Sequence, residues 1–383
     1  MFQNRGKMAQ QKLPGQFVRG DRKPMMAMVE ITNRCNMDCP ICYADSSTSA
    51  VDVPLAKIHH RLKHLLTVTE TPIPIQISGG EPSLRDDLPE IIAMARQLGY
   101  RNIELITNGI RIGREPQFLA LLKKHGLTAV YLQFDGLQAD TTLKIRGRDM
   151  SNTRLRALTA IRETGLCCTL AVVVTRGVND GEIGEIINFA VDNLDVVRAI
   201  NFQSATRLTG RFDVDENYQG YGLEELVDLI ETETGIPKDT FLSEHLGHPS
   251  CNVMSPVFIV KGKLEPLFKY IKADDLMEFL GEKRRDTILA TFAGKKEFFF
   301  RYLLNPQAWR LIAKAAPIFG SNPFNVLKSK HLLIFAKAFM EKDSLDPDRL
   351  KQCCYGITAE HGVYSFCAFN NIYRKVAGNA NSK

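Results

Sequence analysis

The sequence lacks a long uncharged apolar stretch. No run reaches the roughly 18 apolar residues that a membrane-spanning helix needs, and the opening MFQNRGKMAQQK has no apolar signal-peptide core. These absences argue against an integral membrane protein and against a secreted one. We therefore expect a soluble protein of the cytoplasm.

The sequence also lacks an even number of cysteines, so its nine cysteines cannot all pair in disulfides within the chain. A reducing cytoplasm keeps thiols free, so disulfides are not the expected role of these residues. Metal ligands and buried thiols remain as explanations. Disorder is excluded over most of the chain, since 44% of the residues are hydrophobic and 24% are charged.

Basic charge is concentrated in one segment. Residues 282–342 hold twelve Lys or Arg against four Asp or Glu, an excess of +8 in a chain whose net charge is +6. Large aromatic and aliphatic residues are mixed with these cations, and the only Trp of the sequence lies among them. Such mixtures are typical of surfaces that bind anionic lipid headgroups, so we expect peripheral contact with the inner face of the membrane.

The same segment has a second interpretation, a helical subdomain with buried apolar residues. HLLIFAKAFM, residues 331–340, is apolar on nearly every side as a helix, which fits burial as well as it fits a membrane. Nucleic acid is not an expected partner, because the Phe residues occur in runs rather than as spaced platforms for bases.

Short apolar runs rich in β-branched residues alternate with helical patterns that end at Gly, such as LPEIIAMARQLG. This alternation predicts a parallel sheet with right-handed crossovers. Six units predict an α/β fold, a partial (βα)6 TIM-like barrel rather than a closed one. The expected strands are residues 25–32, 73–78, 102–107, 129–134, 168–175 and 197–203.

The length of 383 residues exceeds what such a barrel needs, so we expect further parts. Residues 1–24 are predicted to be a poorly ordered start, and residues 25–236 the barrel. Residues 237–383 are predicted to form a mainly helical, cysteine-containing extension.

Three cysteines follow the first strand in ITNRCNMDCPICYADS: Cys35, Cys39 and Cys42. The carboxyl ends of parallel strands are where functional loops gather. Three thiolates on one loop can bind three irons of a cubane and leave the fourth iron open. A structural zinc ion is the alternative, but the following residues offer it only Asp45. Three buried thiols are a weaker alternative.

The Cys loop and the SGGEP segment (78–82) after the second strand together resemble the radical S-adenosylmethionine (SAM) superfamily over about residues 25–205. The resemblance implies an iron-dependent enzyme in which the three cysteines hold a [4Fe-4S] cluster. The open iron would bind SAM, and an electron from a donor such as ferredoxin or flavodoxin would release a 5′-deoxyadenosyl radical that takes hydrogen from the substrate. An electron carrier without chemistry is the non-enzymatic alternative, and the intact GGEP argues against it.

The resemblance also implies cofactor contacts. Tyr43 would lie near the adenine, and Gly79, Gly80 and Glu81 would receive the methionine amino group, with glycine allowing close approach. Glu81 could instead be a helix-entry residue beside Pro82.

Further candidates lie at the ends of later strands. Asn108, Asp135 and Gln203 stand where ribose or carboxylate contacts are common in the superfamily, although Asn-Gly and Asp-Gly pairs also form turns. Arg146 could pair with the cofactor carboxylate, or it could be an ordinary exposed Arg.

Six cysteines lie outside the loop. Cys167 and Cys168 enter a strand and are expected in the core. The others equal the ligand count of a second, closed [4Fe-4S] cluster, with His248 and His361 as substitute ligands and a zinc site as the alternative. These four are Cys251, Cys353, Cys354 and Cys367.

Segments of the extension, including GHPSC and DRLKQCCYG, resemble the tetraether lipid synthase group, whose relatives include radical methyltransferases of a reduced pterin. The resemblance implies a transferase that attacks an unactivated carbon. We expect a membrane lipid alkyl chain as the substrate, with formation of a carbon–carbon bond or a related modification, in lipid biosynthesis. The alternative is radical methylation or another modification of a reduced pterin, another small molecule or a peptide.

Overall fold

One mixed sheet organises the protein in a computed structural model. The model describes residues 12–213, 215, 217–243, 247–280, 305–320, 325–360 and 362–374. The sheet has twelve strands in the order β1-β14-β13-β2-β4-β5-β6-β7-β8-β12-β10-β11. The six expected strands are its parallel centre: β2 (Met26–Thr32), β4 (Ile75–Gly79), β5 (Ile103–Thr107), β6 (Ala129–Gln133), β7 (Cys167–Val174) and β8 (Val197–Ser204).

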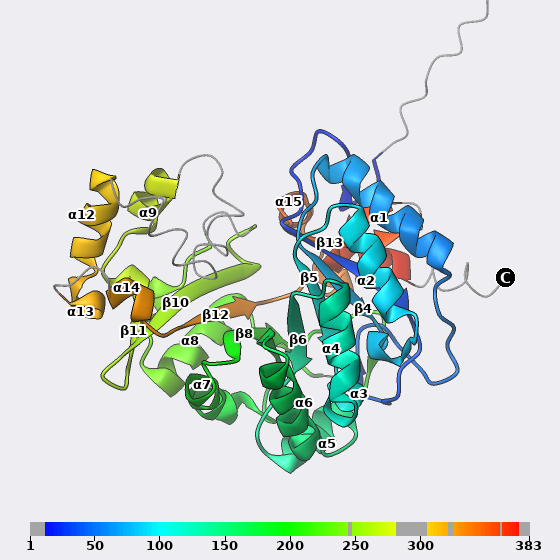
Figure 1. Ribbon diagram of the computed structural model, residues 1–383, viewed down its shortest axis with the longest axis horizontal. Coiled ribbons are helices and arrows are strands. Elements are labelled where there is room, and N and C mark those ends of the chain that lie inside the picture. The colour runs from blue at the N-terminus through cyan, green and yellow to red at the C-terminus, as the bar shows by residue number, and fades with distance from the viewer. Residues whose placement is uncertain are drawn as a thin grey trace, which may run out of the picture.

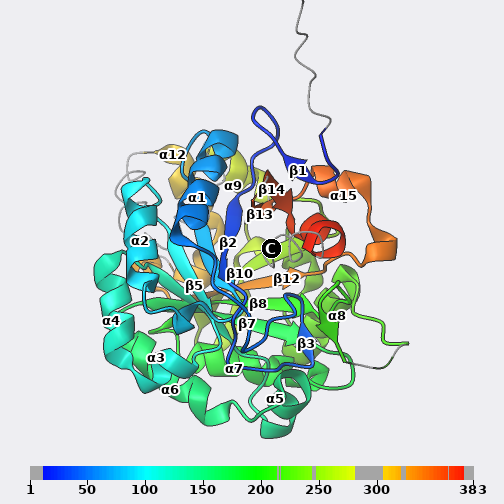
Figure 2. The same cartoon turned by 90° about the vertical axis from the view of Figure 1, so that its right-hand side faces the viewer.

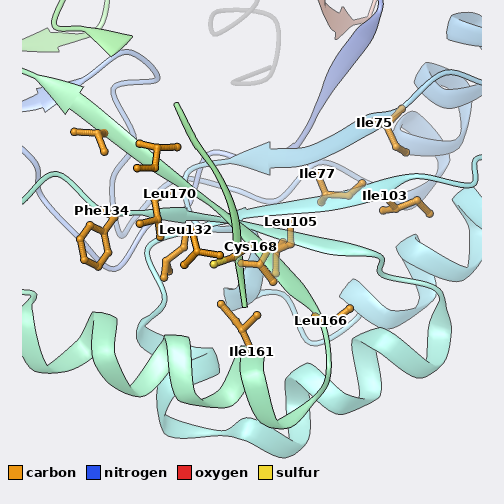
Figure 3. Close-up of a cluster of buried hydrophobic side chains, with 14 of the residues drawn as sticks. Ile75, Ile77, Ile103, Leu105, Leu132, Phe134, Ile161, Leu166, Cys168 and Leu170 are labelled. Carbon is orange, nitrogen blue, oxygen red and sulfur yellow. The ribbon is translucent and has the colours of Figure 1, made fainter. Parts of the chain in front are cut away.

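Helices cover the outer face of this sheet (Figure 1), and Figure 2 shows them as a layer around its curve. Alternate strand residues point outward into this layer, where Ile77, Leu105 and Leu132 pack with Ile161 of a covering helix (Figure 3). The helices after successive strands are α1 (Leu55–Thr69), α2 (Leu88–Gln97), α3 (Ile110–Arg114), α4 (Pro116–His125), α5 (Ala139–Arg146), α6 (Ser151–Glu163), α7 (Ile183–Asp192) and α8 (Leu223–Thr234).

The C-terminal part of the chain extends both edges of the sheet. On one edge, β12 (His331–Lys337) runs parallel beside β8, followed by the antiparallel β10 (Asn252–Val260) and β11 (Lys263–Pro266). On the other edge, β13 (Tyr355–Ala359) runs parallel beside β2, followed by the antiparallel β14 (Gly362–Ser365) and β1 (Gln16–Phe17). The sheet stays open between these edges, which confirms the partial barrel.

The C-terminal region is also helical, as expected. Its helices are α9 (Ala273–Leu280), α12 (Pro306–Lys314), α13 (Ala316–Phe319), α14 (Asn325–Lys328), α15 (Pro347–Lys351) and α16 (Phe366–Ala368). Single turns and a π-turn complete the fold: η1 (Pro82–Leu84), η2 (Asp180–Glu182), η3 (Lys238–Thr240), η4 (Leu267–Lys269), η5 (Lys342–Ser344) and η6 (Phe369–Tyr373). None of the described helices is long and apolar enough to cross a membrane.

The helical interpretation of HLLIFAKAFM is wrong, because its first seven residues form strand β12. The strand lies between β8 and β10, and most of its side chains are buried. A strand covered on both faces has apolar residues at nearly every position, so periodicity cannot distinguish it from a buried helix. Residues 281–304, which hold much of the basic segment, lie outside the described residues.

Candidate functional site

The Cys loop begins where β2 ends. Cys35 and Cys39 are buried beside Met37, and Cys42 lies in β3 (Ile41–Cys42), a short strand paired with β9 (Arg211–Phe212). All three cysteines are free thiols. Burial raises the pKa of the Cys35 thiol to about 12 and also raises that of Cys39. Thiols in such surroundings ionise when a metal cation binds them, and this donor set fits three irons of a cubane.

Gly79 and Gly80 bring the end of β4 against the start of the Cys loop. Gly79 has φ +137°, and a Cβ there would lie 2.0 Å from the Thr32 carbonyl oxygen. A Cβ at Gly80 would lie 2.3 Å from the Arg34 carbonyl oxygen. The backbone N–H of Gly80 donates to Thr32 and that of Glu81 to Arg34, each over 2.8 Å. The chain's own backbone therefore requires glycine here, and it couples the two motifs.

Replacing Gly79 with alanine should lower the free energy of unfolding by about 3 kcal/mol or more, because the new Cβ clashes with backbone as well as adopting a disfavoured φ. Gly262→Ala is the matched control, since Gly262 also has positive φ (+77°) but has no atom within 4 Å of the added Cβ. It should lose only about 1–2 kcal/mol. Urea unfolding of both variants measures the difference, and equal losses would mean that the Gly79 clash is relieved.

Glu81 is a buried cross-link between two strand ends. Its carboxylate accepts from the backbone N–H of Ser83 (3.1 Å), the Thr107 hydroxyl (2.7 Å) and the backbone N–H of Asn108 (2.7 Å). The helix-entry role is therefore present, because Ser83 lies in η1. Burial raises the pKa of the Glu81 carboxyl, although these hydrogen bonds act in the opposite direction.

Asn108 holds the Cys loop in place. Its Nδ2 donates to Asn36 Oδ1 within the loop over 2.8 Å, and its Oδ1 accepts from the backbone N–H of Ile110 at the start of α3 over 3.0 Å. The turn role is therefore real, and the same side chain also positions the loop.

Asp135 is the centre of a buried ion cluster. Both of its carboxylate oxygens pair with Arg146, over 2.7 Å each, and Arg154 adds a contact of 3.2 Å. Burial opposes ionisation of Asp135, but the two guanidinium groups outweigh it and lower the carboxyl pKa. The expectation of an exposed Arg146 is wrong, because its side chain is 7% exposed.

Arg146 also connects this ion cluster to the Cys loop. Its Nη1 donates to the Ile41 carbonyl oxygen over 3.3 Å, and its positive charge lowers the pKa of Cys39, which burial raises. The loop and the ion cluster thus form one unit.

A first cavity, here called the Cys-loop cavity, lies beside this unit. Tyr43 and Gln203 both border it, as does Arg146. The Tyr43 hydroxyl lies 3.3 Å from Ser78 Oγ, and its ring packs edge-on against Phe366 at 5.5 Å between centroids. Gln203 donates to the Tyr131 hydroxyl oxygen. The described residues lining the cavity also include Met28, Ile41, Gln133, Ala171, Val173, Leu208, Arg211 and Phe212.

A second, larger cavity of about 910 Å³ lies on the concave face of the sheet and is here called the strand cavity. The two cavities adjoin, since Gln76, Tyr131, Lys337, Tyr355 and Phe366 border both. Six of the polar side chains that line the strand cavity come from the inner positions of neighbouring strands, and sequence reasoning missed them: Gln76, Glu104, Tyr131, Thr169, Asn201 and Lys337. The available signal was a polar residue in the middle of an otherwise apolar strand.

The four C-terminal cysteines border the strand cavity at the open side of the barrel, near the connection from β12 to β13: Cys251, Cys353, Cys354 and Cys367. Arg349 Nε donates to Cys251 Sγ over 3.1 Å, and the backbone N–H of Met340 donates to Cys367 Sγ over 3.4 Å. His248 borders the same cavity, whereas His361 lies outside the described residues. Within the described part of the chain, no three His, Cys, Asp or Glu side chains are grouped as ligands of a single metal ion.

The two remaining cysteines differ. Cys168 is buried in the core between strands and helices (Figure 3), as expected. Cys167 is half-buried and borders the strand cavity instead.

Comparison with known proteins defines the class of this protein. The family model for the radical SAM superfamily matches residues 29–190. A 7,8-dihydro-6-hydroxymethylpterin dimethyltransferase from Methanocaldococcus jannaschii is 30% identical, over 92% of this chain and 77% of the relative. The chain therefore belongs to the radical SAM superfamily. It is an enzyme that uses a [4Fe-4S] cluster and SAM, which when bound together supply a radical strong enough to abstract hydrogen.

Two further matches cover less of the chain. A probable GTP 3′,8-cyclase from Methanothermobacter thermautotrophicus is 31% identical, over 55% of this chain and 70% of the relative. The crystal structure of Streptococcus suis SuiB bound to precursor peptide SuiA aligns with a TM-score of 0.46 at 18% identity. That alignment covers 55% of this chain and 45% of SuiB.

Proposed function

We propose that the protein catalyses radical methylation, or a related radical modification, of a reduced pterin or a similar small nitrogen heterocycle. The strand cavity carries this proposal, because it offers polar side chains from several strands directly beside the Cys-loop cavity. Concave sites with a few placed polar groups suit small ligands. Similarity to the pterin dimethyltransferase over 92% of the chain supports the same substrate class.

In this proposal, Cys35, Cys39 and Cys42 hold three irons of the [4Fe-4S] cluster. Their loop is fixed by the buried side chain of Asn108 and by the backbone contacts of Gly80 and Glu81, so the cluster would be held on a well-positioned loop. The fourth iron would remain for the amino and carboxylate groups of SAM.

The Cys-loop cavity would then hold the rest of SAM. Tyr43 would contact the adenine, and the Gly79–Glu81 segment would lie near the methionine amino group. Arg146 offers a fixed cation for the methionine carboxylate, since Asp135 holds its orientation. Gln203 borders the same space for the ribose. Electrons would come from a small donor such as ferredoxin or flavodoxin.

The C-terminal cysteines are proposed to hold a second [4Fe-4S] cluster. Four thiols border one cavity, which equals the ligand number of a closed cubane. Arg349 beside Cys251 would help to balance the negative charge of thiolate ligands. A cluster at this place would face the substrate. The cluster could then bind the substrate or carry electrons.

A lipid chain is the competing substrate. Residues 331–337 of the segment that favoured it form β12 in the interior of the sheet, so these seven residues do not form a membrane-binding face. The strand cavity is lined by polar groups and cations as well as apolar residues, which suits a heterocycle better than an alkyl chain. The matched relatives named above are a pterin dimethyltransferase and a GTP cyclase.

Anaerobic turnover of the cluster-loaded protein tests the proposal. SAM and a reductant are supplied with a reduced pterin, with a lipid extract, or with neither, and the formation of 5′-deoxyadenosine is measured. We expect a clear rise only with the pterin, together with a new pterin mass. A rise only with lipid, accompanied by a new lipid mass, would replace the proposal by lipid modification.

A further inference from the structure

The strand cavity contains one carboxylate among its described lining residues, Glu104. Glu104 is the second residue of β5, and its Oε2 accepts from Gln76 Nε2 while its Oε1 accepts from the Thr169 hydroxyl over 3.4 Å. Each oxygen of a carboxylate has two lone pairs, so both can accept a further hydrogen bond. Neighbouring strands thus hold Glu104 in one orientation and leave it capacity for a ligand.

Two buried asparagines, Asn201 and Asn252, border the same cavity and are 3% and 7% exposed. Their Oδ1 atoms have no hydrogen-bond partner among the described residues, and these atoms have almost no surface open to the cavity. The amide of Asn201 is fixed by its Nδ2, which donates to the Tyr131 hydroxyl over 2.6 Å. The two asparagines therefore shape the wall of the cavity, and Glu104 is the acceptor that a ligand can reach.

The Glu104 carboxylate defines the ligand by its chemistry. A carboxylate takes two parallel N–H donors at once, which is the pattern that an amidine edge presents. The 2-amino-4-oxo ring of a reduced pterin has such an edge, with a ring N–H beside an amino group. Guanine has the same edge, so a guanine nucleotide is a second source of this chemistry.

We infer that Glu104 binds the amidine edge of the substrate and is the residue that selects 2-amino-4-oxo heterocycles. This inference rests on the proposed function, since it names the group that recognises the proposed substrate class. The amidine edge would be held toward β5, and the opposite side of the ring would be left toward the wall that the two cavities share.

Calorimetric binding to the cluster-loaded protein tests the inference without turnover. The probes are 7,8-dihydropterin, 7,8-dihydrolumazine, in which an oxygen replaces the 2-amino group, and guanosine triphosphate. The wild-type protein should bind dihydropterin about 10- to 100-fold more tightly than dihydrolumazine, because the oxygen would face the carboxylate without a proton between them. This comparison needs no substitution and so does not depend on the folding of a variant.

Substitutions at Glu104 test whether this side chain causes the preference for dihydropterin over dihydrolumazine. Glu104→Gln should weaken dihydropterin binding by about 10- to 100-fold and remove the preference over dihydrolumazine. Glu104→Asp should keep part of the preference, since it keeps a carboxylate. Glu224→Gln is the matched control, because Glu224 is exposed on α8, and it should change nothing.

The outcomes separate this inference from the proposed function. Tight dihydropterin binding that survives Glu104→Gln would overturn the inference and leave the proposed function standing. Binding of guanosine triphosphate alone, lost in Glu104→Gln, would support the inference and overturn the pterin proposal. Failure of the wild-type protein to bind any of the probes would overturn both.

Discussion

Replacing Cys39 with alanine should abolish reductive cleavage of SAM. Replacing a residue that hydrogen-bonds to a metal ligand lowers metal affinity or activity by about 10- to 100-fold. Replacing a proposed ligand itself should therefore lower the rate of SAM cleavage by more than about 100-fold. The variant should also lose iron and the visible absorption of one cluster. Iron analysis and 5′-deoxyadenosine formation in anaerobically reconstituted protein measure both effects.

Cys168→Ala is the control for this variant, because Cys168 is a thiol buried in the core away from both cavities. It should retain the full iron content. A variant with all three loop cysteines replaced should still keep iron bound by the C-terminal set, whereas Cys353→Ala should lose that iron and keep SAM cleavage. Loss of all iron from the triple variant would contradict the second cluster, and retained cleavage in Cys39→Ala would contradict the proposed ligand set.

Replacing Asp135 with asparagine should lower the free energy of unfolding by about 3–5 kcal/mol. The substitution leaves the guanidinium groups of Arg146 and Arg154 buried, at 7% and 2% exposed, without a counter-charge. SAM cleavage should fall as well, because Arg146 would lose the partner that fixes it beside the Cys loop. Urea unfolding and turnover of the same preparation measure the two effects.

Asp195→Asn is the matched control for this charge removal. Asp195 pairs with Arg162 on the surface, where the two side chains are 55% and 39% exposed. Exposed pairs contribute little, so this variant should lose less than about 1 kcal/mol. Similar losses in the two variants would mean that the Asp135 cluster has no special role in stability.

The central sheet could be predicted because its signals are local. Each of the six strands is a short apolar run, and the helix that follows it has apolar residues at three- and four-residue steps. The structure places all six strands within a residue or two of the predicted bounds. The Cys loop was recognisable for a similar reason, since three cysteines within eight residues form a pattern that needs no knowledge of the fold.

The rest of the site depends on contacts between distant residues. Glu104, Asn201 and Lys337 belong to three strands, and no spacing in the sequence indicates that they border one cavity. Arg146 gave no sign of burial, because its partner Asp135 lies before a Gly and resembles a turn residue. Strand β12 was hidden because apolar residues stand at nearly every position, so its periodicity does not distinguish a strand from a buried helix.

The pairing of β2 with β13 has a consequence for how the protein is made. Thr358 of β13 contacts Met28 of β2 across 330 positions of sequence, so the edge of β2 has no permanent neighbour until almost the whole chain has been synthesised. An unpaired strand edge attracts other chains, and contacts so distant in sequence form slowly. The Cys loop directly follows this edge. We therefore expect the newly made N-terminal part of the chain, including the Cys loop, to be open to aggregation until β13 has been synthesised and can pair with β2.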